Sequence, residues 1–176
     1  MSSGYFPNER RAMLLVGLGA AAVGVAAVWR WPDGKPYPHG EPMAVELSTL
    51  PVGKLLTLHW QERPVWVLRR SASDIATLAQ QETGLTDARS QQSVQPSGCR
   101  NQYRSLTPEI FVAIGLCTHQ GCTPALKPGV GFVCPCHASR YDLAGRVFHA
   151  GPAPANLVIP AHHFASQTQL VIGTDA

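Results

Sequence analysis

Four of the five cysteines lie with two histidines in two short blocks of the chain. The first block spans residues 117–122 (CTHQGC), and the second spans residues 134–137 (CPCH). Thiolates and imidazoles are ligands that zinc and iron commonly take in proteins. Each block follows a short apolar stretch that is typical of a buried strand, so two strand ends can present the blocks to each other. The spacing therefore predicts a metal centre held from two sides.

The number of donor groups limits which metal centre fits. Four cysteines and two histidines exceed the four ligands of one tetrahedral zinc ion. In an exported domain, two surplus cysteines can form a disulfide. A pair of irons bridged by two sulfides can take two thiolates on one iron and two imidazoles on the other, which raises its reduction potential to about −150 to +300 mV. From the residues alone, a zinc-stabilised binding module and an iron–sulfur centre both remain open.

Longer stretches around the blocks point to one family. CTHQGC (117–122) and CPCHASRYD (134–142) resemble the signature of Rieske 2Fe–2S proteins, and more specifically of the Rieske subunits of ubiquinol–cytochrome c oxidoreductases. Residues 45–70, 104–117 and 151–173 are similar to the same family. The resemblance implies an all-β fold, a Rieske-type antiparallel β-sandwich head with a small cluster-binding subdomain, preceded by one N-terminal transmembrane helix.

The resemblance also implies one 2Fe–2S cluster and assigns its ligands. Cys117 and Cys134 match the ligands of the family's inner iron, and His119 and His137 match those of the outer, exposed iron. In this family the imidazole ligands also accept a proton. We therefore expect His137 to be the leading catalytic residue and His119 the second.

Further positions match the surroundings of the cluster in the family. Cys122 and Cys136 match a disulfide that links the two loops. Ser139 and Tyr141 match hydroxyl donors to a bridging sulfide and to a cysteine sulfur, and such donors raise the potential of a cluster. Residues 151–154 (GPAP) match a proline-rich loop that covers the cluster from a third side.

Two residues in the blocks depart from the family pattern. Gln120 stands where the family has an apolar leucine over the cluster, and a polar residue there can admit water. Ala138 stands where glycine is usual, so it is strained if that position requires a positive φ. Neither departure removes a ligand.

The resemblance implies an electron-transfer subunit of a quinol–cytochrome c reductase, which is one component of a proton-translocating oxidoreductase. It would accept one electron and one proton from ubiquinol and pass the electron to a c-type cytochrome subunit, while a cytochrome b subunit takes the second electron. An alternative is the Rieske small subunit of an arsenite-oxidase-type enzyme. The chain is too short to include the mononuclear iron domain of a dioxygenase.

The N-terminal part of the chain predicts a membrane anchor. Residues 1–11 end in Arg10-Arg11, and residues 12–30 contain eighteen consecutive uncharged positions, a length of about 27 Å at 1.5 Å per residue. A cleaved secretory signal has a shorter apolar region, so an uncleaved span is the preferred interpretation. Residues 31–42 contain four prolines and form a tether. Because a cluster-bearing head is exported folded, we interpret the arginine pair as a twin-arginine signal.

Composition and charge exclude other classes of partner. The net charge is +3 without a basic stripe, so nucleic acid is not an expected partner. Only 14% of residues are charged, which fits a turn-rich β protein with a membrane segment. We expect a single-pass protein of the bacterial inner membrane in contact with lipid, with its head on the periplasmic side.

The head is expected over residues 43–176, with its cluster-binding loops at about 115–154. Ser73 and Asp74 resemble an N-cap for a short helix that ends near Gln81. Cys99 is interpreted as a spare thiol in a polar loop, and the remaining histidines as surface or packing residues. Short apolar runs predict strands near residues 44–47, 56–60, 65–68, 110–116, 131–133, 146–148, 157–159 and 169–172.

Overall fold

The computed structural model describes residues 37–175. The expected anchor at 12–30 and the arginine pair lie outside the described residues. Within residues 37–175, no helix combines the length and apolarity needed to cross a membrane.

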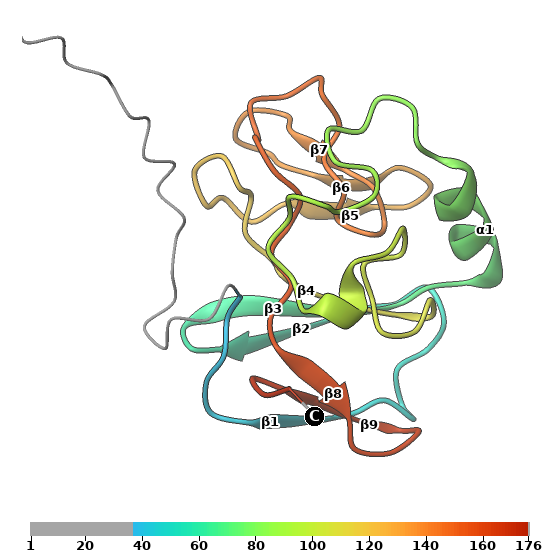
Figure 1. Ribbon diagram of the computed structural model, residues 1–176, viewed down its shortest axis with the longest axis vertical. Coiled ribbons are helices and arrows are strands. Elements are labelled where there is room, and N and C mark those ends of the chain that lie inside the picture. The colour runs from blue at the N-terminus through green and yellow to red at the C-terminus, as the bar shows by residue number, and fades with distance from the viewer. Residues whose placement is uncertain (1–36, 176) are drawn as a thin grey trace, which may run out of the picture.

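Strands dominate the described part of the chain, with one α-helix, and they form three antiparallel sheets arranged as three tiers (Figure 1). The strand order is β1-β9-β8 in the lower tier, β2-β3-β4 in the middle tier and β5-β6-β7 in the upper tier. The strands are β1 (Met43–Glu46), β2 (Leu55–Trp60), β3 (Arg63–Arg69), β4 (Ile110–Ile114), β5 (Ala125–Lys127), β6 (Gly131–Val133), β7 (Arg140–Tyr141), β8 (His162–Phe164) and β9 (Gln169–Ile172).

The middle sheet is covered on both faces, which explains why β3 and β4 are apolar almost throughout. Val65 and Val67 of β3 pack towards the lower sheet, in a cluster that includes Leu170 of β9. Trp66 and Leu68 alternate with them and belong to a second cluster beneath the upper tier. Alternate side chains of β3 therefore pack into two separate apolar cores, one on each face of the middle sheet.

The second core connects the middle sheet to the cluster-binding region. Trp66 stacks on Phe132 of β6 with ring centroids 4.7 Å apart. Cys117 and Cys134 are members of this core, together with Tyr141. Both cysteine blocks thus stand directly on the packed interior of the head.

Local signals fix the hairpin between β2 and β3 and the helix that follows β3. The two-residue turn at Gln61 and Glu62 has positive φ at both positions, which matches the twist of a tight hairpin. Helix α1 (Ala72–Gln80) begins after Ser71, whose hydroxyl accepts from the backbone N–H of Asp74, while the Asp74 carboxylate accepts from Ser71 N–H. The expected N-cap at Ser73 and Asp74 is therefore wrong by two to three residues.

The expected strands at 146–148 and 157–159 are also wrong. Residues 157–159 are buried and extended, but their hydrogen bonds go to separate segments: Leu157 N–H donates to Gly145, Ile159 N–H donates to Val94, and Val158 accepts from Ile114. No ladder forms because no single neighbouring strand supplies these partners. Around residues 146–148, pairing is limited to two isolated bridges, Tyr141 with Val147 and Leu85 with Phe148.

Cys99 is fully buried, at the end of a short 3₁₀ helix (Ser97–Cys99). Its sulfur lies 3.9 Å from Nε2 of His162, which is also buried. Burial raises the pKa of the Cys99 thiol to about 12, so the thiol stays protonated and unreactive. The interpretation of Cys99 as a spare thiol holds, but it lies in the interior rather than on the surface of a polar loop.

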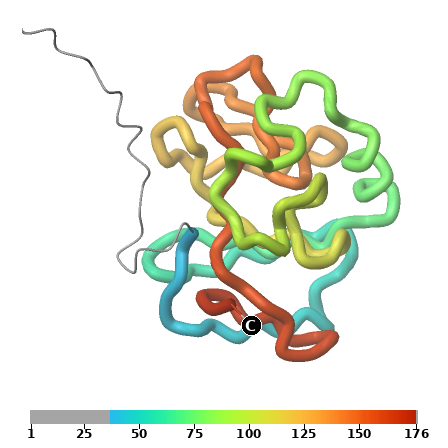
Figure 2. The backbone as a smooth tube through the Cα atoms, in the orientation of Figure 1, coloured from blue at the N-terminus to red at the C-terminus, as the bar shows by residue number. Residues whose placement is uncertain are grey.

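The two ends of the described chain meet in the lower part of the head (Figure 2). Gly40 N–H donates to Gly173, and Ala161 N–H donates to Pro38. His39 Nε2 lies 2.7 Å from the Asp175 carboxylate. The head is thus closed at the end where the expected tether enters, on the opposite side from the cysteine blocks.

Candidate metal centre

The two cysteine blocks adopt the same backbone arrangement. In the first block, Cys117 N–H donates to Cys122 and Gly121 N–H donates back to Cys117, at 2.8 and 2.9 Å. The block that starts at Cys134 repeats both bonds at 2.8 and 3.0 Å, with partners Ser139 and Ala138. Each block is therefore a compact loop, closed on itself, that follows β4 or β6.

The repeated arrangement shows what the alanine at position 138 does to the second loop. Gly121 and Ala138 occupy the same position in their loops, and both have positive φ, +76° and +57°. Glycine adopts this conformation without steric cost, whereas alanine does so at about 1 kcal/mol or more. The condition for strain at Ala138, a positive φ, is therefore met, and Ala138 holds the second loop under local strain.

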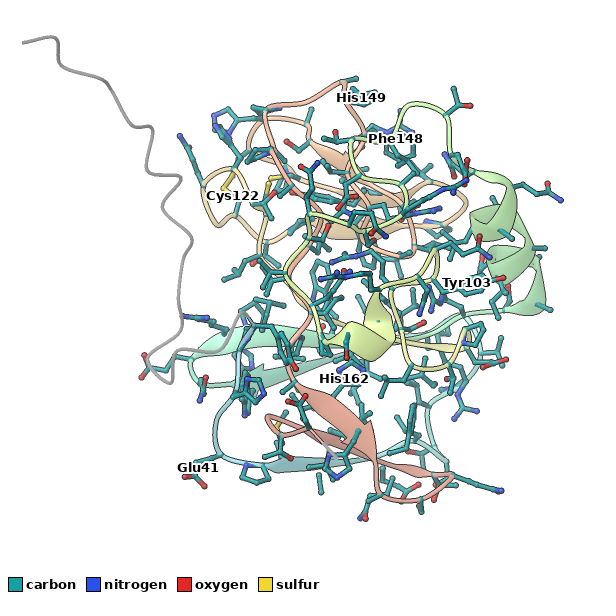
Figure 3. The ribbon with its side chains drawn as sticks, in the orientation of Figure 1. Glu41, Tyr103, Cys122, Phe148, His149 and His162 are labelled. Carbon is teal, nitrogen blue, oxygen red and sulfur yellow. A yellow bond between two sulfur atoms is a disulfide. The ribbon has the colours of Figure 1, made fainter. Side chains whose placement is uncertain are left out.

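A disulfide between Cys122 and Cys136 links the two loops, as the resemblance implied, and the Cα atoms of the two cysteines are 6.5 Å apart. Figure 3 shows Cys122 in the upper part of the head, well away from His162. The sulfurs of Cys122, Cys136 and Cys134 lie within 4.8 Å of one another. Because two of these three sulfurs are bonded together, only Cys134 offers a thiolate from this group.

The two remaining thiols of the blocks are free and buried. Cys117 and Cys134 are 3% and 2% exposed. The Tyr141 hydroxyl donates to the Cys117 sulfur at 3.3 Å. Burial opposes ionisation of Cys117, but hydrogen bonds led by that from Tyr141 outweigh it and lower the pKa of the thiol. The thiolate is the form that binds iron, so the surroundings favour the ligand state.

The two imidazoles of the blocks meet on the outer side of the thiols. The ring centroids of His119 and His137 are 4.8 Å apart, and the rings are nearly perpendicular at 82°. His137 is exposed, whereas Nδ1 of His119 is buried and has no hydrogen-bond partner. A buried nitrogen without a partner is costly unless it binds a ligand, so the donor set fits a metal between the two loops.

Ser139 lies under the proline-rich loop at 151–154. Its side chain is fully buried, and its Oγ accepts from Ala153 N–H at 3.1 Å. Because a hydroxyl has one proton, this contact leaves the Ser139 O–H free to donate elsewhere. Residues 151–154 therefore lie against the second loop, as the resemblance implied.

Thr118 was not expected to contribute to the site. Its backbone N–H donates to the Tyr141 hydroxyl at 3.1 Å, and its own hydroxyl donates to Ala155 at 2.7 Å. Thr118 thus orients the tyrosine and ties the first loop to the proline-rich segment. The sequence gives little indication of this, because a threonine between two ligands has no distinctive spacing.

A mostly apolar cavity of about 570 Å³ lies beside the first loop. Its walls include Leu116, Val158 and the two residues that follow Thr118. Gln120 is exposed at this cavity, so the departure from leucine replaces apolar surface with an amide next to His119.

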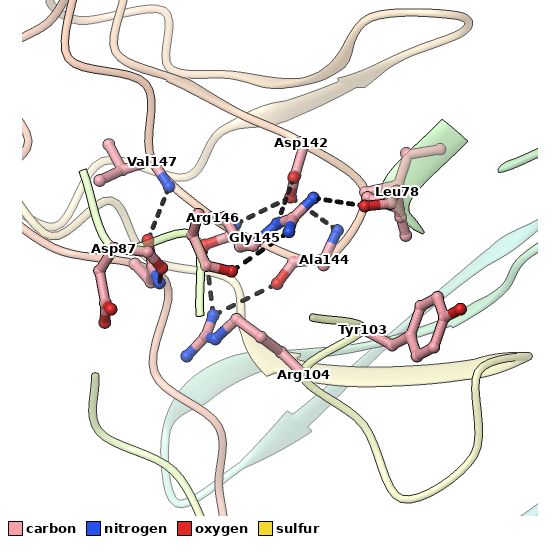
Figure 4. A network of polar contacts seen from close by, with 12 residues as sticks. Leu78, Asp87, Tyr103, Arg104, Asp142, Ala144, Gly145, Arg146 and Val147 are labelled. Carbon is pink, nitrogen blue, oxygen red and sulfur yellow. Dashed lines mark hydrogen bonds and ion pairs between the residues drawn. The ribbon is translucent and has the colours of Figure 1, made fainter. Parts of the chain in front are cut away.

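Buried arginines support the upper tier from within (Figure 4). Arg146 forms an ion pair with Asp142 at 2.6 Å, with both side chains at most 4% exposed, and also donates to Leu78 of α1. Arg104 is fully buried and donates to the carbonyl groups of Ala144 and Gly145. These residues were missed because charged side chains are usually exposed, and a sequence pattern does not reveal one that is buried.

Comparisons with known proteins agree with this geometry. The model of the Rieske [2Fe-2S] domain matches residues 88–163. A ubiquinol–cytochrome c reductase iron–sulfur subunit of Allochromatium vinosum is 39% identical, with 99% of this chain and 96% of that protein covered. The proteins of the same name from Bradyrhizobium diazoefficiens and Rickettsia conorii are 37% and 36% identical, over 93% and 94% of this chain and 94% and 93% of their own lengths.

These relatives favour the quinol enzyme over the arsenite-oxidase-type and zinc alternatives. The matched domain agrees with one Rieske-type 2Fe–2S cluster, and the described head has the Rieske-type fold. The chain belongs to the family of Rieske iron–sulfur subunits of ubiquinol–cytochrome c reductases.

Proposed function

We propose that this chain carries single electrons within a membrane-bound quinol–cytochrome c reductase and receives a proton at a histidine when it does so. Its family membership supports electron transfer in such an enzyme. The proposal that a histidine receives the proton rests on one observation, the layering of the site. Buried Cys117 and Cys134 stand behind two imidazoles that meet at 4.8 Å near the surface.

The layering supports the following place for each ligand. Cys117 and Cys134 hold the inner iron, and His119 and His137 hold the outer one. When bound, the cluster supplies one-electron chemistry at the high potential that mixed thiolate and imidazole ligation gives. The Tyr141 hydroxyl donates to Cys117, and Ser139 has a proton available to donate, so both stabilise added negative charge.

The exposure of His137 supports it as the residue that receives the proton. The His137 side chain is exposed, whereas that of His119 is only partly exposed. A quinol hydroxyl can therefore approach the His137 ring and transfer its proton there. Added negative charge beside the ring makes it more basic, so it retains the proton for as long as the electron stays. His119 has the second role in this step.

The relatives and the N-terminal sequence support the proposed partners and placement. The named relatives are subunits of ubiquinol–cytochrome c reductases, which supports a cytochrome b subunit and a c-type cytochrome subunit as partners and ubiquinol as donor. Residues 1–11 would lie in the cytoplasm after twin-arginine export, and residues 12–30 would cross the bacterial inner membrane. Residues 31–42 would link the membrane to the head, 43–176, on the periplasmic side, and the end of this segment at Pro38 and Gly40 is bonded to the head.

Metal analysis of the purified full chain tests this proposal. We expect iron and acid-labile sulfide in equal amounts with little zinc, and a reduced-state electron spin resonance spectrum typical of histidine-ligated clusters. His137→Gln should remove that signature. His149→Gln, at an exposed histidine outside the blocks (Figure 3), should retain it. Zinc in place of iron, or an unchanged spectrum in His137→Gln, would refute the ligand assignment.

A further inference from the structure

The buried side-chain amide of Asn156 holds the C-terminal end of the proline-rich loop (151–154) in place. Asn156 is 2% exposed and lies two residues after this loop, which ends at Pro154. Its Oδ1 accepts from Val147 N–H at 2.8 Å. Its Nδ2 donates to the carbonyl of Asp87 at 2.9 Å and to Ser93 Oγ at 2.8 Å. One side chain therefore fastens the end of the loop to two other segments.

The residue after Asn156 is fastened as well. Arg104, fully buried, donates to the Leu157 carbonyl at 2.6 Å, and Leu157 N–H donates to Gly145 at 2.8 Å. The C-terminal end of the loop is thus bonded to the buried Val147, Gly145 and Arg104. It is also bonded to the partly buried Asp87 and Ser93. Such contacts leave the loop one well-defined position.

At Gly151 and Ala153 the proline-rich loop contacts Ser139, which follows the second cysteine block. Ala153 N–H donates to Ser139 Oγ at 3.1 Å. At Gly151 the loop runs so close that an added Cβ would lie 2.8 Å from the Cα of Ser139. The position of the loop therefore decides which lone pair of Ser139 is occupied, and hence where the Ser139 proton can point.

We infer that Asn156 is a positioning residue for electron transfer: it fixes the proline-rich loop so that Ala153 N–H orients the Ser139 hydroxyl towards the cluster. This inference rests on the proposed function, because it assumes that Ser139 donates to the cluster. Without the Asn156 amide, Asp87, Ser93 and Val147 each lose a partner, and the loop loses its defined position. The Ser139 proton is then no longer held in place, and the reduction potential falls.

A double-mutant cycle on the full chain tests the inference. Ser139→Ala and Asn156→Leu should each lower the reduction potential, and the double variant should lie no lower than Ser139→Ala alone. Ser71→Ala removes the N-cap of α1 and destabilises the protein without contact with the loop, so it should leave the potential unchanged. Additive lowering, or an unchanged potential in Asn156→Leu, would overturn the inference.

A milder variant covers the case in which Asn156→Leu does not assemble. Ser93→Ala removes one partner of Asn156, and it should shift the potential in the same direction but by less. It should also speed hydrogen exchange at Ala153 N–H, whereas Ser71→Ala should not. Unchanged exchange and potential in Ser93→Ala would count against the inference. If the unsubstituted chain itself carries no iron or sulfide, the proposed function fails instead, which separates the two results.

Discussion

The base of the head (sheets β1-β9-β8 and β2-β3-β4) and its tip (sheet β5-β6-β7 with the loops around the cysteine blocks) are stabilised by different kinds of interaction. The base packs the sheet β1-β9-β8 against β2-β3-β4 through a continuous apolar cluster with few polar members. The tip has strands of only two or three residues, and it depends on a disulfide, a buried ion pair and single hydrogen bonds between loops. Apolar packing in the base is shared among many side chains, whereas the loops of the tip, which rest on the second apolar core, are held in addition by these individual contacts.

This difference shows how the head can expose a reactive site without losing its fold. The tip must present His137 at the surface, and so it cannot bury that part of itself in an apolar core. Covalent and charged contacts take over the stabilising role there. Loss of a single contact in the tip should therefore have a large effect, on the stability of the head where the contact is the buried ion pair and on the site where it is the disulfide.

The largest effect is expected from Asp142→Ala. The change leaves the Arg146 guanidinium buried without its counter-ion and removes the acceptor for two backbone N–H groups, so the free energy of unfolding should fall by about 3–5 kcal/mol. Denaturant unfolding measures this. Glu82→Ala breaks an exposed ion pair with Arg89 and should change stability very little. Equal losses of stability in Asp142→Ala and Glu82→Ala would contradict the stabilising role of the buried ion pair.

Cys122→Ser should have the next largest effect, and it should act on the tip. Loss of a crosslink that closes a loop of about 15 residues should cost about 3 kcal/mol, and the cluster should be lost more rapidly under oxidising conditions. The cluster absorbance over time reports this loss. Cys99→Ala changes a buried cysteine near the base and should leave cluster retention intact. Full retention in Cys122→Ser would argue against the proposed stabilising role of the disulfide.

Acid should weaken the base through His162. Burial lowers the pKa of this imidazole below its ordinary 6.5, so the unfolded chain takes up the proton first as pH falls. The free energy of unfolding should therefore decline below about pH 6.5, by up to about 1.4 kcal/mol per pH unit. Urea midpoints at pH 7 and 5 measure this decline. His162→Gln should flatten the pH dependence, whereas His59→Gln, at an exposed residue of β2, should not.

The smallest effect is expected from Ala138→Gly. Relief of the positive φ should raise the free energy of unfolding by about 0.5–1 kcal/mol. Ala150→Gly is the matched control: Ala150 is exposed and has no positive φ, so glycine there should give no gain. Loss of stability in Ala138→Gly would show that the second loop is not strained at this position.

Residue patterns predicted the regular part of the base and the chemistry of the tip. The apolar runs located β3 and β4, and the cysteine spacing identified both loops and, through the resemblance, the Cys122–Cys136 disulfide. The patterns failed where contacts depend on segments far apart in the chain. Residues 157–159 were expected as a strand because they are apolar, but their backbone partners come from separate segments.

The buried polar residues were also not predicted from the sequence. Arg104 and Asn156 look like ordinary surface residues in the sequence, and only tertiary packing gives them buried partners. Strand β8 was missed for a related reason, because its two histidines carry no strand signal and pair only through the register with β9. Local pattern therefore predicts elements and ligands, whereas the framework that orients them depends on the fold.

The central claim is that two thiolates and two imidazoles hold the cluster so that electron uptake is accompanied by proton uptake at His137. The reduction potential of the full chain, measured from neutral to strongly alkaline pH, tests it most directly. We expect a constant value near neutrality and then a fall of up to about 59 mV per pH unit where the oxidised form has lost the His137 proton and one proton is taken up with each electron. A potential that stays flat across this range would contradict the claim.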